Sequence, residues 1–406
     1  MNVLDHFTPR DRCSFGGVKQ PSIPLTLLLA LAGTAACSKS NDTTSSANDA
    51  GPKSTDAGVN DAGVSYDWTA LDAEEFAGSW VTEGLVVMVG GQVVHEKYGT
   101  GWTATMPHIL YSASKSIGSA LVGIAINDGL MQTSDSICKY VTPPDGGSDA
   151  TLCDTTIADL LHMSSGIQWN EAYTNGDPTA ENDLELLYGN QADMGAYTAS
   201  QPRAWDSGTT FDYSSGDADL LADAFKAALK AQDAIAYAQA KLFGPAGMSV
   251  LCEEDRSGTV IFSTDCFTTP RDFAKFGQLF LDNGMVGSTQ VVPASWVTYS
   301  ITPAPSVAAP TSRIDDAGPG PGGSYGAQWW LNSTSPTATP DTWEYPHEPV
   351  DGYNAEGHYG QKLIVIPSRN MVIARTGADL ATTYDPDAMI GAAVAAVDKA
   401  TGKGAQ

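Results

Sequence analysis

Hydrophobic and polar positions near the start of the folded region follow the pattern of a β-hairpin. Two runs, Leu85–Val89 and Gln92–Lys97, flank the dipeptide Gly90-Gly91, and glycine pairs favour the tight turns that join antiparallel strands. The segment Ser112–Asp128 instead carries apolar residues at helical spacing, with Gly129 placed to end a helix. We therefore predict a hairpin and then a buried helix.

The same pattern predicts helices in the middle of the chain and strands towards its end. The expected helices are Thr156–Met163, Ala218–Ala231, Ala234–Phe243 and Pro270–Asn283. The expected later elements are strands at Tyr325–Leu331, Lys362–Pro367 and Met371–Thr376, a loop at Asp315–Gly323 and a helix at Ile390–Lys399. Because strands and helices at both ends enclose a helical middle, we predict an α+β fold with an inserted, mainly helical domain.

The N-terminus has the features of an export signal. Positive residues precede a short apolar run, Ile23–Gly33, which is too short to cross a bilayer. The following Thr34-Ala35-Ala36-Cys37 resembles a bacterial lipobox, although Thr34 replaces the usual Leu, and Cys37 would then carry lipid. The alternative is cleavage at an Ala-x-Ala-like site that leaves Cys37 unmodified. We predict a signal peptide over 1–36 and export as an envelope lipoprotein, or otherwise to the periplasm or medium.

Residues 37–66 are predicted to form a flexible tether. This segment is dominated by Ser, Thr, Asn, Asp, Ala and Gly and has almost no apolar side chains, so it cannot bury enough surface to offset the entropy of ordering. The remaining residues, 67–402, would form the folded domain and divide into an α/β part at about 67–150 and 290–402 and a helical part at about 151–290.

Charge and cysteine content narrow the function classes further. The 406 residues include 21 Lys and Arg against 47 Asp and Glu, a formal charge of −26, which disfavours nucleic-acid binding. Of the six cysteines, four lie in the folded region, and we expect the local disulfides Cys138–Cys153 and Cys252–Cys266. Each would close a loop of about 15 residues and contribute ~3 kcal/mol; free buried thiols are the alternative. The six histidines are scattered, so we expect no metal and no cofactor.

A Ser-x-x-Lys motif at the start of the predicted helix supplies candidate chemistry. One helical turn places Ser112 and Lys115 on the same face, where an amine with a lowered pKa can take the serine proton. The helix N-terminus also offers N–H groups to a developing oxyanion. The alternative is a helix-capping serine with a solvated lysine. The motif also occurs at Ser136–Lys139, without an apolar helix after it.

Five segments stand in order along the chain: YSASKSI at Tyr111–Ile117, TIADLLHMSSGIQW at Thr156–Trp169, FDYSSGDADLLA at Phe211–Ala222, PRDFAKFGQLFL at Pro270–Leu281 and GHYGQKLIVIP at Gly357–Pro367. Together they resemble the penicillin-recognising serine hydrolases, which include class C β-lactamases, DD-peptidases, esterases and 6-aminohexanoate-dimer hydrolases. The resemblance runs from about Trp68 to the end of the chain. It implies a β-lactamase/transpeptidase-like fold, with an antiparallel sheet flanked by helices.

The resemblance also implies roles for individual residues. Ser112 would be the nucleophile, Lys115 its base, and Tyr213 the group that relays the proton to the leaving group; a phenol beside an ammonium is expected to have a lowered pKa. The backbone N–H groups of Ser112 and Gln361 would form the oxyanion hole. The alternative for Tyr213 is a core aromatic residue, and for His358 a histidine in a tight, Gly-flanked strand.

Departures from the family pattern bear on the substrate. Ser215 stands where class C β-lactamases have Asn, and His358-Tyr359-Gly360 where they have Lys-Thr-Gly. An imidazole is mostly neutral at pH 7, so strong β-lactamase activity is not expected. Tyr173, in QWNEAY at Gln168–Tyr173, resembles a substrate-facing residue of the 6-aminohexanoate-dimer hydrolase branch. Trp329 and Trp330 are candidates for walls of the cleft, although paired Trp in a strand is more often core.

We therefore predict a hydrolase that cleaves a small ester or linear amide through an acyl-enzyme. The alternatives are a DD-peptidase or β-lactamase, and a non-catalytic envelope receptor on the same fold. We expect no nucleic-acid partner, and contact with a membrane only through an N-terminal lipid anchor.

Overall fold

The described part of the chain forms one compact unit built on a seven-stranded sheet. The structure is a computed structural model, and it describes residues 64–143, 151–171, 192–308, 323–333, 343–379 and 384–403. The expected signal peptide, Cys37 and nearly all of the tether lie outside these residues, as does Tyr173. No helix in these ranges is long and apolar enough to cross a membrane.

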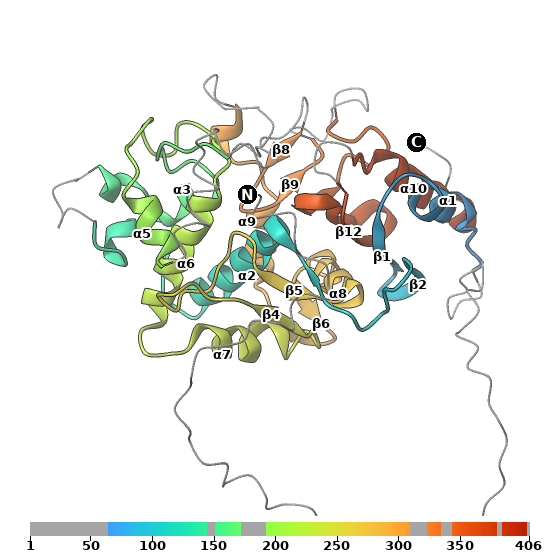
Figure 1. The fold of residues 1–406 in the computed structure, drawn as a ribbon, viewed down its shortest axis with the longest axis horizontal. Coiled ribbons are helices and arrows are strands. Elements are labelled where there is room, and N and C mark those ends of the chain that lie inside the picture. The colour runs from blue at the N-terminus through green and yellow to red at the C-terminus, as the bar shows by residue number, and fades with distance from the viewer. Residues whose placement is uncertain are drawn as a thin grey trace, which may run out of the picture. The chain divides into compact units, whose positions relative to one another are not determined.

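Strands from both ends of the chain meet in the large sheet, which is antiparallel throughout (Figure 1). Its order is β2-β1-β12-β11-β10-β9-β8. The strands are β1 (Thr82–Val89), β2 (Gln92–Tyr98), β8 (Ser324–Tyr325), β9 (Trp330–Leu331), β10 (Tyr353–Gly357), β11 (Gln361–Ile366) and β12 (Met371–Gly377). The predicted hairpin is confirmed as β1 and β2, and the predicted strands near the end as β11 and β12.

Helices cover both faces of this sheet because its central strands are apolar on both sides. Leu85 and Val87 of β1 pack with α1 (Thr69–Ala77) and α10 (Asp387–Thr401), whereas Val86 and Met88 face the core that contains α2 (Ser114–Asn127) and α8 (Pro270–Leu281). Figure 1 shows α1 and α10 together beside β1, with α8 below the sheet. The α+β architecture predicted from the sequence is confirmed.

The middle of the chain is mainly helical, with small sheets at its border. Its helices are α3 (Ile157–Leu161), α5 (Met194–Ala199), α6 (Ser215–Leu229), α7 (Ala234–Ala238) and α9 (Ala294–Ser300). The small strands are β3 (His108–Ile109), β4 (Val250–Cys252), β5 (Cys266–Thr268), β6 (Met285–Val286) and β7 (Thr289–Gln290). A capping box between Thr156 and Asp159 starts α3, as expected where a threonine precedes a helix by one residue.

Two predicted elements differ from the structure. The segment expected as one strand over Tyr325–Leu331 is a hairpin of β8 and β9, because Gln328 adopts a positive φ of 66° and Gly326 N–H donates to Trp329 O. The helix expected over Ala234–Phe243 is regular only to Ala238 and continues as a π-helical turn, Gln239–Phe243. The spacing of apolar residues along the sequence does not indicate either the turn at Gln328 or the π-helical turn.

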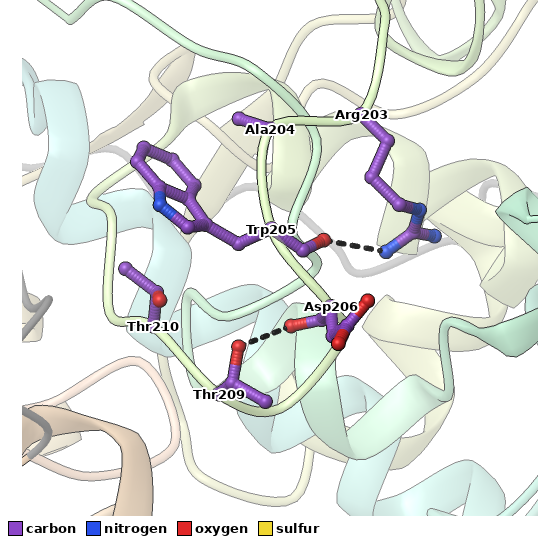
Figure 2. Close-up of a pocket in the computed structure, with 6 residues that line it drawn as sticks. All are labelled: Arg203, Ala204, Trp205, Asp206, Thr209 and Thr210. Carbon is purple, nitrogen blue, oxygen red and sulfur yellow. Dashed lines mark hydrogen bonds between the residues drawn. The ribbon is translucent and has the colours of Figure 1, made fainter.

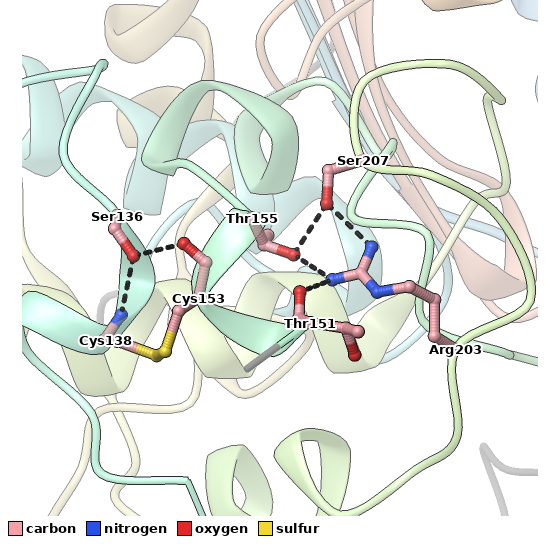
Figure 3. Close-up of a disulfide and its surroundings, with 7 residues drawn as sticks. All are labelled: Ser136, Cys138, Thr151, Cys153, Thr155, Arg203 and Ser207. Atoms are coloured by element: carbon pink, nitrogen blue, oxygen red, sulfur yellow. Dashed lines mark hydrogen bonds between the residues drawn. A yellow bond between two sulfur atoms is a disulfide. The ribbon is translucent and has the colours of Figure 1, made fainter. Parts of the chain in front are cut away.

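Both expected disulfides, Cys138–Cys153 and Cys252–Cys266, are present. Figure 3 shows that the first is surrounded by a polar cluster centred on Arg203, which donates to Ser207 Oγ at 2.7 Å and to Thr155 Oγ1 at 2.9 Å. Ser136 Oγ donates to Cys153 O at 2.6 Å. The second disulfide joins β4 to β5.

A buried ion network joins α1 to the interior strand β12 of the large sheet. The guanidinium of Arg375, 0% exposed, donates through Nε to Glu75 Oε2 at 2.6 Å and through Nη1 to Gly360 O at 2.7 Å, and it pairs with Asp379. Thr82 Oγ1 also donates to Glu75, at 2.6 Å. A buried cation held in this way is stable only while its acceptors remain.

We expect Glu75→Ala to lower the free energy of unfolding by about 3–5 kcal/mol, because it leaves a buried guanidinium without its main partner. Urea denaturation followed by circular dichroism measures the change. Glu74→Ala is the matched control, since this neighbouring carboxylate is partly exposed and accepts from Trp80 Nε1. Equal losses in the two variants would contradict this prediction.

Candidate active site

Ser112 lies in a single 3-10 turn, Tyr111–Ala113, that leads directly into α2. The N-cap of α2 is Ala113, which has no side chain to cap the helix. Ser112 is partly exposed, whereas Ser114, Lys115 and Ser116 are buried. The helix-capping alternative for Ser112 and the solvated-lysine alternative for Lys115 are therefore wrong.

Lys115 Nζ is held by three oxygen atoms from three parts of the chain. It lies 3.0 Å from Ser112 Oγ, 3.1 Å from Ser215 Oγ at the start of α6, and 2.9 Å from the carbonyl oxygen of Ser263. The side chain is 2% exposed. One turn of helix places Ser112 and Lys115 together, as the spacing predicts, but the other two contacts come only from the fold.

Burial lowers the pKa of Lys115 to about 8, although the negative charges of Glu171 and Asp219 act in the opposite direction. Desolvation disfavours the ammonium, so a neutral amine becomes available close to neutral pH. A neutral amine 3.0 Å from a serine hydroxyl is positioned to accept its proton.

If Lys115 is the general base, kcat/KM for an ester should rise with pH through a midpoint near 8, because only the neutral amine can accept the proton. The profile is measured from pH 4 to 10 with a neutral substrate. His358 provides the contrast, since burial lowers its pKa to about 4. A midpoint near 4 instead of 8 would contradict the assignment and favour the histidine.

The Tyr213 side chain extends from the loop before α6 and lies beside Lys115. Lys115 Nζ lies 5.0 Å from the centroid of the Tyr213 ring, and Tyr213 stacks on Trp330 with centroids 5.1 Å apart. The side chain is 5% exposed, and Ser112 is close enough to affect the pKa of its hydroxyl. Trp330 thus borders the site, whereas Trp329 is fully buried against Phe276 and Phe280.

The expectation that Tyr213 has a lowered pKa is wrong. Burial raises the pKa of Tyr213 far above its usual value, and the charge of Glu171 raises it further, while the hydrogen bond to Ser112 opposes them. Desolvation of a phenolate outweighs the effect of the nearby amine. Tyr213 is therefore a neutral phenol at pH 7, suited to donate or relay a proton and not to act as a resting base.

The turn His358–Gly360 connects β10 to β11 and lies close to the segment that carries the nucleophile. The His358 and Tyr359 rings both make edge contacts with Tyr111, at 5.9 and 5.4 Å between centroids. A Cβ at Gly357 would collide with the carbonyl oxygen of Leu110, so glycine is required for this approach. Gly360 has a φ of 79° and is held by Arg375, which places Gln361 at the start of β11.

The side chain of Gln361 faces the sheet. It donates to Gly377 O at 2.6 Å and accepts from Gly377 N–H at 3.2 Å. Only its backbone is thus offered for the role in an oxyanion hole that the resemblance implies. Ser215, 1% exposed, faces Lys115 and not the outside.

Two acidic residues beside Lys115 were not predicted. Glu171, 5% exposed, accepts from Ser215 Oγ at 2.6 Å, and Asp219 accepts from Ser263 N–H at 3.0 Å. Both partners of these carboxylates contact Lys115. A Glu two residues after a Trp and an Asp four residues after a Ser are unremarkable in the sequence, so only long-range contacts reveal them.

The second Ser-x-x-Lys has a different arrangement. Ser136 caps a short turn by accepting from Cys138 N–H, and Lys139, whose side chain is 53% exposed, pairs with Asp135. These are structural contacts. In the described ranges, no three His, Cys, Asp or Glu side chains are grouped to hold a metal ion.

An open depression of about 520 Å³ lies in the loop before Tyr213 (Figure 2). Its lining residues are Arg203, Ala204, Trp205, Asp206, Thr209 and Thr210. Arg203 donates to Trp205 O, and Thr209 Oγ1 donates to Asp206 O. Because the lining contains none of Ser112, Lys115 and Tyr213, we do not assign the reaction to this depression.

Comparisons with known proteins agree with this arrangement. Residues 77–251 match the Beta-lactamase family model. A 6-aminohexanoate-dimer hydrolase of Paenarthrobacter ureafaciens is 27% identical over 326 residues, which cover 78% of this chain and 76% of that protein.

Solved structures show the same fold. A Bacillus anthracis protein, provisionally described as a 6-aminohexanoate-dimer hydrolase, aligns with a TM-score of 0.63 at 19% identity and covers 85% of each chain. A family VIII carboxylesterase aligns with a TM-score of 0.58 at 14% identity, over 80% of this chain and 95% of that one.

Proposed function

We propose that this chain, which is similar to β-lactamase-family serine hydrolases, cleaves an ester or a linear amide through an acyl-enzyme on Ser112. The observation that carries this proposal is the position of Lys115 Nζ, 3.0 Å from Ser112 Oγ in a buried setting that lowers its pKa. A serine nucleophile needs an adjacent base of this kind.

The proposed reaction has two stages. In the first, Lys115 takes the Ser112 proton while Oγ attacks the acyl carbon, and the backbone N–H groups of Ser112 and Gln361 stabilise the oxyanion. The proton then passes through the Tyr213 hydroxyl to the departing alcohol or amine. In the second stage, water attacks the Ser112 ester and gives a proton to the same pair of residues. The bond between the acyl carbon and Ser112 Oγ then breaks, Oγ takes that proton back, and the acid leaves.

The His358-Tyr359-Gly360 motif favours a substrate that does not need a positive charge at this motif to bind a carboxylate. His358 stands in the place of the family's lysine, and burial lowers its pKa to about 4, so it is neutral at pH 7. Arg375 lies behind Gly360 but is fully buried and paired with Glu75 and Asp379. These features support an ester or linear amide over a β-lactam, whose carboxylate would meet no fixed charge at this motif.

Export is also part of the proposal. The N-terminal signal pattern motivates it, and the two disulfides support it, because disulfides persist mainly in oxidising compartments. Mass spectrometry of the envelope fraction would show whether the mature chain begins at Cys37 and carries lipid.

A substrate panel tests the proposed activity. Purified protein is assayed with p-nitrophenyl esters of short acids, the linear dimer of 6-aminohexanoate and a chromogenic cephalosporin, each with Ser112→Ala as control. We expect kcat/KM to be highest for an ester or the linear amide. Faster hydrolysis of the cephalosporin would indicate a β-lactamase, and a stable penicilloyl adduct without turnover would indicate a DD-peptidase.

A further inference from the structure

Glu171 is a buried acidic residue next to the site, without an assigned task. Its carboxylate accepts three hydrogen bonds: from Trp169 Nε1 at 2.5 Å, from Ser215 N–H at 2.9 Å and from Ser215 Oγ at 2.6 Å. Trp169 itself packs on Gly216, where any larger residue would collide with its ring. The carboxylate is therefore held in one position, against the start of α6.

These contacts determine the direction of the hydrogen bonds at Lys115. The Ser215 hydroxyl gives its only hydrogen to Glu171, so Ser215 Oγ must accept from Lys115 Nζ. The carbonyl oxygen of Ser263 can also only accept, at 2.9 Å from Nζ. Two N–H bonds of Lys115 are thus committed, and the third direction of Nζ is left for Ser112 Oγ. In the neutral amine, that third direction is the lone pair.

We propose that Glu171 is a positioning residue that acts through Ser215 to aim the lone pair of Lys115 at the Ser112 hydroxyl. This inference rests on the proposed function, in which Lys115 is the base. Without an obligate acceptor behind it, the Ser215 hydroxyl can turn and donate to Nζ, and the lone pair is then no longer available to Ser112.

The charged and titratable groups around Lys115 predict a second measurable effect of Glu171, which is a change in the pKa of Lys115. Nζ faces the Tyr213 ring at 5.0 Å, with Glu171 behind Ser215 and Asp219 behind Ser263. The charges of Glu171 and Asp219 both raise the pKa of Lys115 against the effect of burial. Loss of the Glu171 charge should therefore lower the pKa of the base as well as misdirect its lone pair.

Glu171→Gln tests both effects, because it keeps the shape of the side chain. If the amide nitrogen faces Ser215 Oγ, the hydroxyl must turn its hydrogen towards Lys115; if it faces the other way, two N–H donors lose their acceptor. We expect the high-pH plateau of ester kcat/KM to fall by about 10- to 100-fold, because misplacing a reacting group by about 1 Å can cost on the order of 100-fold. The pH at which kcat/KM reaches half of this plateau should also fall by about one unit or more.

A double-mutant cycle isolates the path through Ser215. Ser215→Ala should lower the plateau by itself, and adding Glu171→Gln to it should lower the plateau little further, since residues acting as one unit are not additive. Glu348→Gln is the matched control: Glu348 is also buried, but burial raises its pKa well above the usual range, so the change removes no charge. We expect Glu348→Gln to change neither the high-pH plateau of kcat/KM nor the midpoint of its pH profile.

The outcomes separate this inference from the proposed function. A Glu171→Gln plateau that falls without a shift of the midpoint would indicate a merely structural role and overturn the inference. A near-normal plateau in Ser215→Ala would do the same, even if Glu171→Gln does not fold. Ester turnover that survives Ser112→Ala would overturn the proposed function, and the inference with it.

Discussion

Ser112→Ala is expected to lower kcat for the best ester substrate by about 10⁴- to 10⁶-fold, the scale on which loss of a serine nucleophile acts. The reason is geometric: Ser112 Oγ is partly exposed, 3.0 Å from Lys115 Nζ, and it precedes a helix that supplies N–H groups. Burst and steady-state kinetics measure the loss. Intact mass after treatment with a fluorophosphonate should show one adduct, formed when Ser112 Oγ displaces fluoride.

Ser136→Ala is the matched control for this variant, because Ser136 has the same Ser-x-x-Lys spacing but donates to Cys153 O. We expect it to retain normal turnover and labelling. Peptide mapping that places the adduct on any other residue, or an undiminished rate in Ser112→Ala, would exclude Ser112 as the nucleophile.

Removal of either proton-transfer partner is expected to have the next largest effect. Lys115→Ala and Tyr213→Phe should each lower ester kcat by at least about 100-fold, the lower range for loss of general acid–base catalysis. Lys115→Ala should also abolish the acid limb near pH 8, because the group that titrates there is gone. The double variant should lose much less than the product of the two single losses.

Tyr213→Phe is the more discriminating change, since it removes one hydroxyl and leaves the stacking on Trp330. Tyr237→Phe is the matched control, because Tyr213 and Tyr237 are both 5% exposed. The Tyr237 hydroxyl donates to Asp128 at 2.9 Å. Lys139→Ala is the corresponding control for Lys115. Near-normal activity in Tyr213→Phe would make Tyr213 a core aromatic residue and leave Lys115 to move the proton alone.

Local features of this protein followed from the sequence alone. The hairpin β1–β2, the helix after Ser112, the Ser112–Lys115 contact and both disulfides depend on neighbours within about 15 residues, where spacing constrains geometry. The α+β fold also followed, because strands and helices at both ends enclose a helical middle and several ordered segments resemble one family. Spacing could not reveal the break at Gln328, because it depends on a positive φ at one non-glycine residue.

The electrostatics of the site, in contrast, were decided only by the tertiary structure. Lys115 and Ser215 are 100 residues apart in the chain, and Glu171 contacts Ser215, while Trp169 packs against the start of α6. The pKa of Tyr213 rises although an amine lies beside it, because complete burial and the charge of Glu171 outweigh that neighbour. The sequence therefore determined which groups could react. Long-range packing decided their protonation, because a pKa depends on every charge and every desolvating side chain around the group, whatever their separation along the chain.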